Sequence, residues 1–76
     1  MRTAESPQIN GAAVRALREA LDIGQGQMAR DLGITPSFLY RIEHGDRGCR
    51  ASLLRAIAAY LAVTPMAIIR SEDDAA

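Results

Sequence analysis

Apolar residues recur along this chain at the spacing of α-helices. Val14, Leu17 and Leu21 are separated by three and four positions, which places them on one face of a helix with its repeat of about 3.6 residues. A second group with the same spacing lies near the other end of the chain and consists of Leu54, Ile57 and Leu61. The pattern predicts an all-α protein in which each helix buries one apolar face.

Residues that favour helix ends divide the chain into five short helices. Thr35 can cap a helix that starts with Pro36, a position where the missing N–H of proline breaks no hydrogen bond. Thr64 can cap the last helix in the same way. Gly33 and Gly45 favour the left-handed conformation that follows many helix C-termini. The expected helices cover residues 11–22, 25–32, 36–44, 51–61 and 65–71.

The connections between these helices are short, which predicts one compact five-helix domain over residues 9–70. Residues 1–8 are polar and are expected to form a flexible N-terminal arm, and residues 71–76 an acidic tail. A chain of 76 residues with 49% hydrophobic and 24% charged residues is long enough for one small folded domain. The longest apolar run, residues 57–63, is too short to span a membrane, and the N-terminus lacks the apolar segment of a signal peptide. We therefore expect a cytoplasmic protein with no membrane contact.

Metal, cofactor and enzyme chemistry find little support in the sequence. His44 and Cys49 are the only residues of their types, which is too few for a disulfide within the chain or for a tetrahedral zinc site. No nucleophile, base and acid are spaced as a catalytic group. We expect no metal, no cofactor and no enzymatic activity, and we interpret Cys49 as an ordinary loop thiol.

The zero net charge hides an uneven distribution. All nine basic residues are arginines, and residues 9–70 contain eight of them against five acidic residues. Four arginines fall within fifteen positions, namely Arg41, Arg47, Arg50 and Arg55. Such a basic patch suits phosphates and guanine edges. The same arginines could equally serve only to solvate the surface.

A helix-turn-helix is expected over about residues 25–44. Gly33 lets the chain turn sharply between the second and third helices. On the third helix, Leu39 and Ile42 fall on one side and are expected to anchor it to the core. The opposite side carries polar residues that can form hydrogen bonds, namely Ser37, Tyr40, Arg41 and His44. An exposed, capped helix with this polar face fits the major groove of DNA.

A longer set of spaced residues extends this motif. The set is Gln25-x-x-Met28-Ala29-x-x-Leu32-Gly33-Ile34-Thr35-x-x-x-Leu39-x-Arg41-Ile42-Glu43-x-Gly45. With it the chain resembles the phage repressor and Cro family of helix-turn-helix proteins, also called the xenobiotic-response-element family, over roughly residues 14–69. The resemblance implies a lambda repressor-like fold and a sequence-specific DNA-binding regulator that usually acts as a dimer.

The resemblance also implies roles for individual residues. Gln25 matches a contact to the DNA backbone or to an outer base, Pro36 and Ser37 match the base-reading start of the third helix, and Arg41 matches a reader one turn on. Because the proline ring has no donor, we expect base reading to shift to Ser37, Tyr40 and Arg41. His44 and the loop arginines are expected near phosphates. The full expected DNA-binding set is Gln25, Thr35, Pro36, Ser37, Tyr40, Arg41, His44, Arg47 and Arg50.

Two glycines depart from the family pattern. Gly24 stands where the family prefers a Ser or Thr that caps the second helix. Gly26 replaces a better helix former, which costs about 1 kcal/mol relative to Ala. We expect the start of the second helix to be weakly held until a phosphate orders it.

Structural roles are expected for three residues around the motif. The resemblance implies that Arg18, late in the first helix, pairs with Glu43 at the end of the third. Removing one partner should be costly if the pair is buried and nearly neutral if it is exposed. Phe38 lies beside Ile42 on the helix surface and is expected to flank the core.

The last expected helix is apolar on nearly all sides, which points to a second copy of the chain. Met66 and Ile69 are expected to form a homodimer interface, with recognition helices about 34 Å apart. The alternative is that Ile68 closes the core and Met66 stays exposed without a partner.

The sequence predicts a DNA-binding transcriptional regulator that reads a pseudo-palindromic operator on double-stranded DNA through the major groove, as a dimer. One alternative is an antitoxin or restriction-system controller, which binds DNA and also has a protein partner. The other is a helix-turn-helix that binds only protein.

Overall fold

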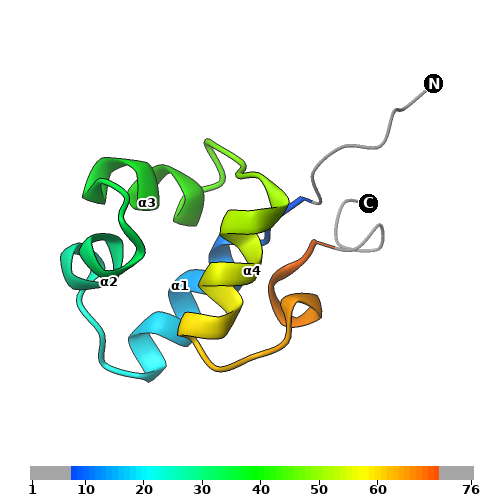
Figure 1. Cartoon of the computed structure of the whole chain (residues 1–76), viewed down its shortest axis with the longest axis horizontal. Coiled ribbons are helices and arrows are strands. Elements are labelled where there is room, and N and C mark those ends of the chain that lie inside the picture. The colour runs from blue at the N-terminus through cyan, green and yellow to red at the C-terminus, as the bar shows by residue number, and fades with distance from the viewer. Residues whose placement is uncertain (1–7, 71–76) are drawn as a thin grey trace.

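The structure, a computed structural model, describes residues 8–70 and is all-helical over this range (Figure 1). Its elements are α1 (Gly11–Ala20), α2 (Gln25–Leu32), α3 (Pro36–Glu43), α4 (Ala51–Tyr60) and the 3₁₀ helix η1 (Pro65–Ile68). Figure 1 shows α2 and α3 on one side of the molecule and η1 on the opposite side, with α1 and α4 between them. The predicted all-α class is confirmed, but the fifth α-helix is wrong.

The chain leaves η1 as an extended segment because it pairs with the start of the domain. Ile69 forms a single antiparallel bridge with Ile9, and the N–H of Asn10 donates to the carbonyl of Ile68 at 2.8 Å. The side chain of Thr64 caps nothing, so the helix has no strong start. The pairing reaches Gln8, whose carbonyl accepts from the N–H of Arg70 at 2.8 Å. Residues 1–7 of the expected arm and the expected tail 71–76 lie outside the described residues.

Helix α1 ends two residues earlier than predicted, which removes Leu21 from the core. Asp22 adopts the left-handed conformation at a φ of 59°. The N–H of Ile23 then donates back to the carbonyl of Arg18 at 3.1 Å, as in a Schellman motif. Ile23 packs against the core in place of Leu21, which is 51% exposed. The expectation that Leu21 continues the buried stripe is therefore wrong.

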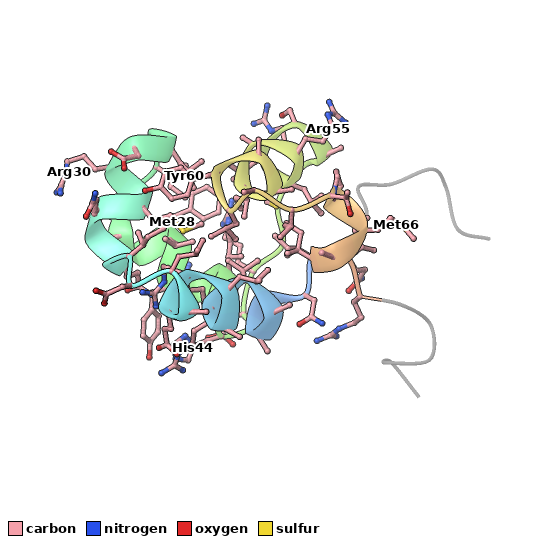
Figure 2. All side chains as sticks on the ribbon, turned by 90° about the horizontal axis from the view of Figure 1, so that it is seen from below. Met28, Arg30, His44, Arg55, Tyr60 and Met66 are labelled. Atoms are coloured by element: carbon pink, nitrogen blue, oxygen red, sulfur yellow. The ribbon has the colours of Figure 1, made fainter. Side chains whose placement is uncertain are left out.

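The core draws on every element of the domain. Met28 from α2 points into the interior (Figure 2) and is fully buried. Seven large side chains are buried almost completely: Val14, Met28, Leu39, Ile42, Leu54, Ile57 and Ile68. On the surface, the hydroxyl of Tyr60 in α4 donates to Oδ2 of Asp31 in α2 at 2.7 Å, and this bond raises the pKa of the tyrosine. Helix α2 is thus held both by the core and by α4.

The N-terminus of α1 lies directly against the C-terminal end of α3. Gly11 is buried at this crossing. A Cβ atom at Gly11 would overlap the carbonyl oxygen of Ile42 and would lie 2.9 Å from that of Glu43. Both obstacles are backbone atoms, which cannot rotate away. The absence of a side chain at this position therefore allows α3 to end against α1.

A buried polar cluster joins α1, α2 and α3 at the same end of α3. Arg18 donates to both carboxylate oxygens of Glu43, from Nε at 2.7 Å and from Nη2 at 3.1 Å. Its remaining nitrogen, Nη1, donates to the carbonyl of Ile23 at 2.7 Å. Gln25 at the start of α2 also donates to Glu43, at 3.0 Å. Only 8% of Arg18 and 5% of Glu43 is exposed, so the expected pair is present as a buried bidentate ion pair.

The hydrogen bond from Glu43 raises the pKa of Arg18, against the opposing effect of burial. The guanidinium therefore keeps its charge throughout the accessible pH range. Every polar side-chain atom that is fully buried within residues 8–70 has a hydrogen-bond partner. The cluster thus meets the condition under which buried charges are tolerated.

Replacement of the helical glycines should have opposite effects at two positions. Gly11→Ala places a methyl group against backbone carbonyls and should lower the free energy of unfolding by about 1–3 kcal/mol. Gly26→Ala in α2 meets nothing within 4 Å and should raise it by up to about 1 kcal/mol, the helix propensity difference. Urea denaturation followed by circular dichroism measures both. An equally stabilising effect at the two positions would show that α1 and α3 do not meet closely.

Removal of one member of the buried ion pair should be strongly destabilising. Glu43→Ala leaves the guanidinium of Arg18 buried without its anion and should cost about 3–5 kcal/mol. The double variant Arg18→Met with Glu43→Leu removes both charges and should recover most of that loss. Thermal and urea denaturation give the comparison. A loss below about 1 kcal/mol for Glu43→Ala would mean that the pair behaves as a surface ion pair.

Candidate nucleic-acid interface

Helices α2 and α3 form the helix-turn-helix expected from the sequence. Gly33 after α2 is left-handed, with a φ of 76°. The N–H of Ile34 donates to the carbonyl of Ala29 at 2.9 Å, which closes the end of α2. Ala29 is fully buried between the helices. A small residue here and a glycine in the turn let α3 pack closely across α2 (Figure 1).

The start of α3 is capped as predicted. Oγ1 of Thr35 accepts a hydrogen bond from the N–H of Phe38 at 3.1 Å, and Pro36 occupies the first helical position. The end of α3 resembles the end of α2, because the glycine that follows it, Gly45, is also left-handed, with a φ of 78°. Both ends of this helix are thus fixed by local bonds, and its eight residues keep one orientation.

The two sides of α3 differ sharply in exposure. Leu39 and Ile42 are fully buried, and Glu43 belongs to the buried ion pair. On the other side, Ser37, Tyr40 and Arg41 are exposed, as are Thr35 and Pro36 at the start of the helix. The helix therefore lies on the body of the protein with one polar side open to solvent.

A shallow hollow collects most of the expected base-reading residues. It has a volume of about 380 Å³, and its lining residues are Gln25, Pro36, Ser37, Tyr40, Arg41 and Asp46. Asp46 is the member that the sequence analysis missed. Its N–H donates to the carbonyl of Arg41 at 2.9 Å, because the left-handed turn at Gly45 folds the chain back along α3. The glycine after the helix was the available signal for this return.

A second hollow lies next to the first at the start of α3. Its volume is about 530 Å³, and its lining residues are Thr35, Ser37, Phe38, Arg41 and Arg47. The guanidinium carbon of Arg47 lies 4.5 Å from the centre of the half-buried Phe38 ring. Arg41 and Ser37 line both hollows, so the two form one continuous polar surface around α3.

Tyr40 and His44 act as a stacked pair on this surface. Their ring centres are 3.9 Å apart and their planes differ by 19°. Nδ1 of His44 donates to the carbonyl of Tyr40 at 2.9 Å, since a carbonyl can only accept. His44 is exposed just after α3 and lies at one edge of the molecule in Figure 2. Both residues of the pair are exposed.

The side chain of Gln25, which is expected to contact DNA, is already engaged within the protein. Its Nε2 already donates to Glu43, and the residue is half-buried although it lines the first hollow. The side-chain oxygen remains as an acceptor. Gly24 provides no side-chain cap for α2, and the hydrogen bond from Gln25 to Glu43 ties the start of this helix to the buried cluster.

Two arginines of the predicted basic stretch lie apart from the hollows. Arg50 is exposed at the N-cap of α4 and lines neither of them. Arg55 projects from α4 at the edge of the view in Figure 2 opposite to His44. A single patch of all four arginines is therefore wrong, because α4 runs away from α3 after the loop.

The part of the chain that the structure describes holds neither a metal-binding cluster nor a membrane-spanning helix. No group of three His, Cys, Asp or Glu side chains could hold a metal ion within residues 8–70. No helix there is long and apolar enough to cross a membrane. Burial raises the pKa of the Cys49 thiol, which keeps it protonated at neutral pH.

Comparisons with known proteins agree with this geometry. The restriction-modification controller protein C.AhdI from Aeromonas hydrophila superposes with a TM-score of 0.70 and 26% identity, over 75% of this chain and 83% of that chain. A hypothetical transcription factor, NHTF from Neisseria, superposes with a TM-score of 0.75 and 18% identity, over 99% of this chain and 93% of that chain.

A part of Fe(II)-HppE, 35% of that chain, superposes on 88% of this one with a TM-score of 0.75 and 22% identity. At this identity, as for NHTF, the likeness shows the fold alone. A search of curated proteins gives no match.

A family model described as a helix-turn-helix domain matches residues 11–67, which is most of the chain. The match spans all four α-helices and includes the expected motif. The resemblance to repressor and Cro proteins of the helix-turn-helix type is confirmed at this level, and the chain belongs to the helix-turn-helix domain family.

Proposed function

We propose that the chain is a transcriptional regulator that binds double-stranded DNA with α3 in the major groove. One observation carries the proposal: α3 is fixed to the core on one side and exposes a continuous polar side on the other. Ser37, Tyr40 and Arg41 are exposed there and line a common hollow. A short, rigid helix with such a side matches the width of the major groove.

The polar side of α3 suits the edges of base pairs. Arg41 can donate two hydrogen bonds to guanine, and Ser37 can donate to or accept from either type of pair. Asp46 beside them can accept from the amino groups of cytosine or adenine, and its negative charge disfavours phosphates. We assign base recognition to these three residues, with the Tyr40 hydroxyl at the edge of the contact.

Residues around the helix suit the sugar-phosphate backbone. Arg47 and Thr35 line the second hollow, and His44 lies just beyond the C-terminal end of α3. Arg50, exposed at the N-cap of α4, is the remaining candidate. Contacts of this kind fix the register of the helix in the groove without carrying sequence information.

A regulatory role is supported by one neighbour in particular. C.AhdI is described as a restriction-modification controller and shares 26% identity with this chain. That likeness also favours a second candidate, a controller of a restriction-modification system, which is a narrower form of the same proposal. A transcriptional reporter fused to the DNA upstream of the chain's own gene and of any adjacent nuclease gene distinguishes the two.

We also propose that the chain acts as a homodimer on a pseudo-palindromic operator. Met66 in η1 is 78% exposed and is the most exposed of the large apolar side chains within residues 8–70. It lies at a different edge of the molecule from His44 (Figure 2), so two copies could meet through it and leave both α3 helices free. Ile69 is half-buried and paired with Ile9, so it contributes less than Met66.

DNA recognition predicts distinct effects for two arginines. With duplexes selected from a random pool, Arg41→Ala should lose about 1–3 kcal/mol of discrimination at one position of each half-site. Arg47→Ala should weaken binding to all sequences alike and reduce the salt slope by about 1. Arg55→Ala, on α4 away from α3 (Figure 2), is the matched control and should change neither quantity.

Fluorescence anisotropy over a series of salt concentrations measures these constants. Failure of the pool to yield any enriched sequence, together with binding that does not weaken as salt is added, would indicate a domain that binds protein instead.

The dimer predicts a selective effect of charge at η1. Met66→Asp should convert the protein to monomers in sedimentation equilibrium while its thermal stability stays close to that of the wild type, because the side chain is mostly exposed. Leu21→Asp provides the control, since Leu21 is also exposed but lies beyond the far end of α1. A dimer that survives Met66→Asp would move the interface elsewhere.

A further inference from the structure

The contact between Arg47 and Phe38 joins a loop cation to the folded core. The guanidinium carbon lies 4.5 Å from the ring centre, well inside the range of a cation–π interaction. The Phe38 ring is half-buried and packs against the core, whereas Arg47 is exposed in the loop after α3. The fixed ring of Phe38 therefore restricts the conformations of the long, flexible Arg47 side chain.

Both partners of this contact are held in place by α3. The N–H of Phe38 donates to the capping oxygen of Thr35 at 3.1 Å. The N–H of Asp46, the residue before Arg47, donates to the carbonyl of Arg41 at 2.9 Å. The distance between the Phe38 and Arg47 backbones is thus set by the helix and by the turn that follows it.

No carboxylate competes for this guanidinium among the described residues. The ion pairs found within residues 8–70 join Arg15 and Arg18 to glutamates, and Arg47 takes part in none of them. A guanidinium stacked on a ring keeps its N–H groups at the edge, where they remain available as donors. One paired with a carboxylate would have to break that pair before it could bind a phosphate.

We propose that Phe38 is a positioning residue for DNA binding, which orders Arg47 before the DNA arrives so that its N–H groups meet a backbone phosphate. The inference rests on the proposed function and adds to it a residue that does not itself contact DNA. Arg47 and Phe38 line the same hollow as Thr35, Ser37 and Arg41. A side chain that is already ordered loses less conformational entropy when it binds.

The test compares Phe38→Leu, which keeps an apolar side chain but loses the ring, with Phe38→Tyr, which keeps the ring. Affinity for a selected duplex is measured by fluorescence anisotropy over a salt series. Phe38→Leu should weaken binding roughly two- to fivefold and leave the salt slope unchanged, because the charge of Arg47 remains. Phe38→Tyr should bind like the wild type.

A double-mutant cycle separates positioning from a general effect on the fold. In the Arg47→Ala background, Phe38→Leu should have no further effect on affinity, since there is no guanidinium left to order. Val63→Ala, another half-buried residue packed on the core, controls for lost stability and should leave affinity unchanged. If Phe38→Leu weakens binding equally with and without Arg47, the proposal is overturned.

A measurement without DNA keeps this inference separate from the proposed function. In nuclear magnetic resonance spectra of the free protein, the side-chain protons of Arg47 should show an upfield ring-current shift that Phe38→Leu abolishes and Phe38→Tyr retains. Absence of the shift in the wild-type chain would refute the ordering of Arg47. Absence of DNA binding by a wild-type chain that shows the shift would instead refute the proposed function.

Discussion

The buried carboxylate of Glu43 is the constraint on which the rest of this structure depends. It is the last residue of α3, and it accepts hydrogen bonds from Arg18 of α1 and from Gln25 of α2. A buried carboxylate without such donors would be strongly unfavourable, so three helices must take up their positions together. The bare backbone of Gly11 makes this possible by letting α1 touch the end of α3. The orientation of α3 is therefore a property of the whole domain and not of the helix-turn-helix alone.

Because α3 is anchored along one side, its opposite polar side stays open to solvent. The C-terminal end is fixed by charge and by the crossing with α1, and the middle by Leu39 and Ile42. The start is held by the local cap from Thr35 and by Phe38, which packs against the core, and the polar side remains uncovered. A surface that is ordered in advance loses little entropy on binding, which suits the role in DNA recognition that we propose for α3. Gln25 joins the two regions, because it lines the exposed hollow and donates to the buried carboxylate.

Much of this architecture could be predicted from the sequence because its signals are local. Gly33, Gly45 and the Thr35–Pro36 pair mark the ends of α2 and α3 in the residues themselves. All four α-helices end in the same left-handed turn, but at the ends of α1 and α4 the residue is Asp22 or Ala62. A residue other than glycine is a much weaker signal for that conformation, so the apolar spacing alone extends α1 past Leu21 and predicts that Leu21 is buried. The prediction of a fifth α-helix is wrong for a different reason, because Ile69 pairs with Ile9, sixty positions away in the sequence.

The parts of the candidate site that escaped prediction are those that depend on the chain folding back. Asp46 reaches the polar surface around α3 because Gly45 reverses the chain, and the same turn brings Arg47 to Phe38. The turn therefore does more than end α3. It brings an acid beside Arg41 and carries an arginine to the start of the helix, so that opposite charges flank the same polar side. A basic surface alone favours any phosphate, whereas a carboxylate among the arginines disfavours contacts that a specific base pair does not compensate. The selectivity that we propose for this surface then depends on one left-handed glycine, Gly45, as much as on the side chains that we propose to face DNA.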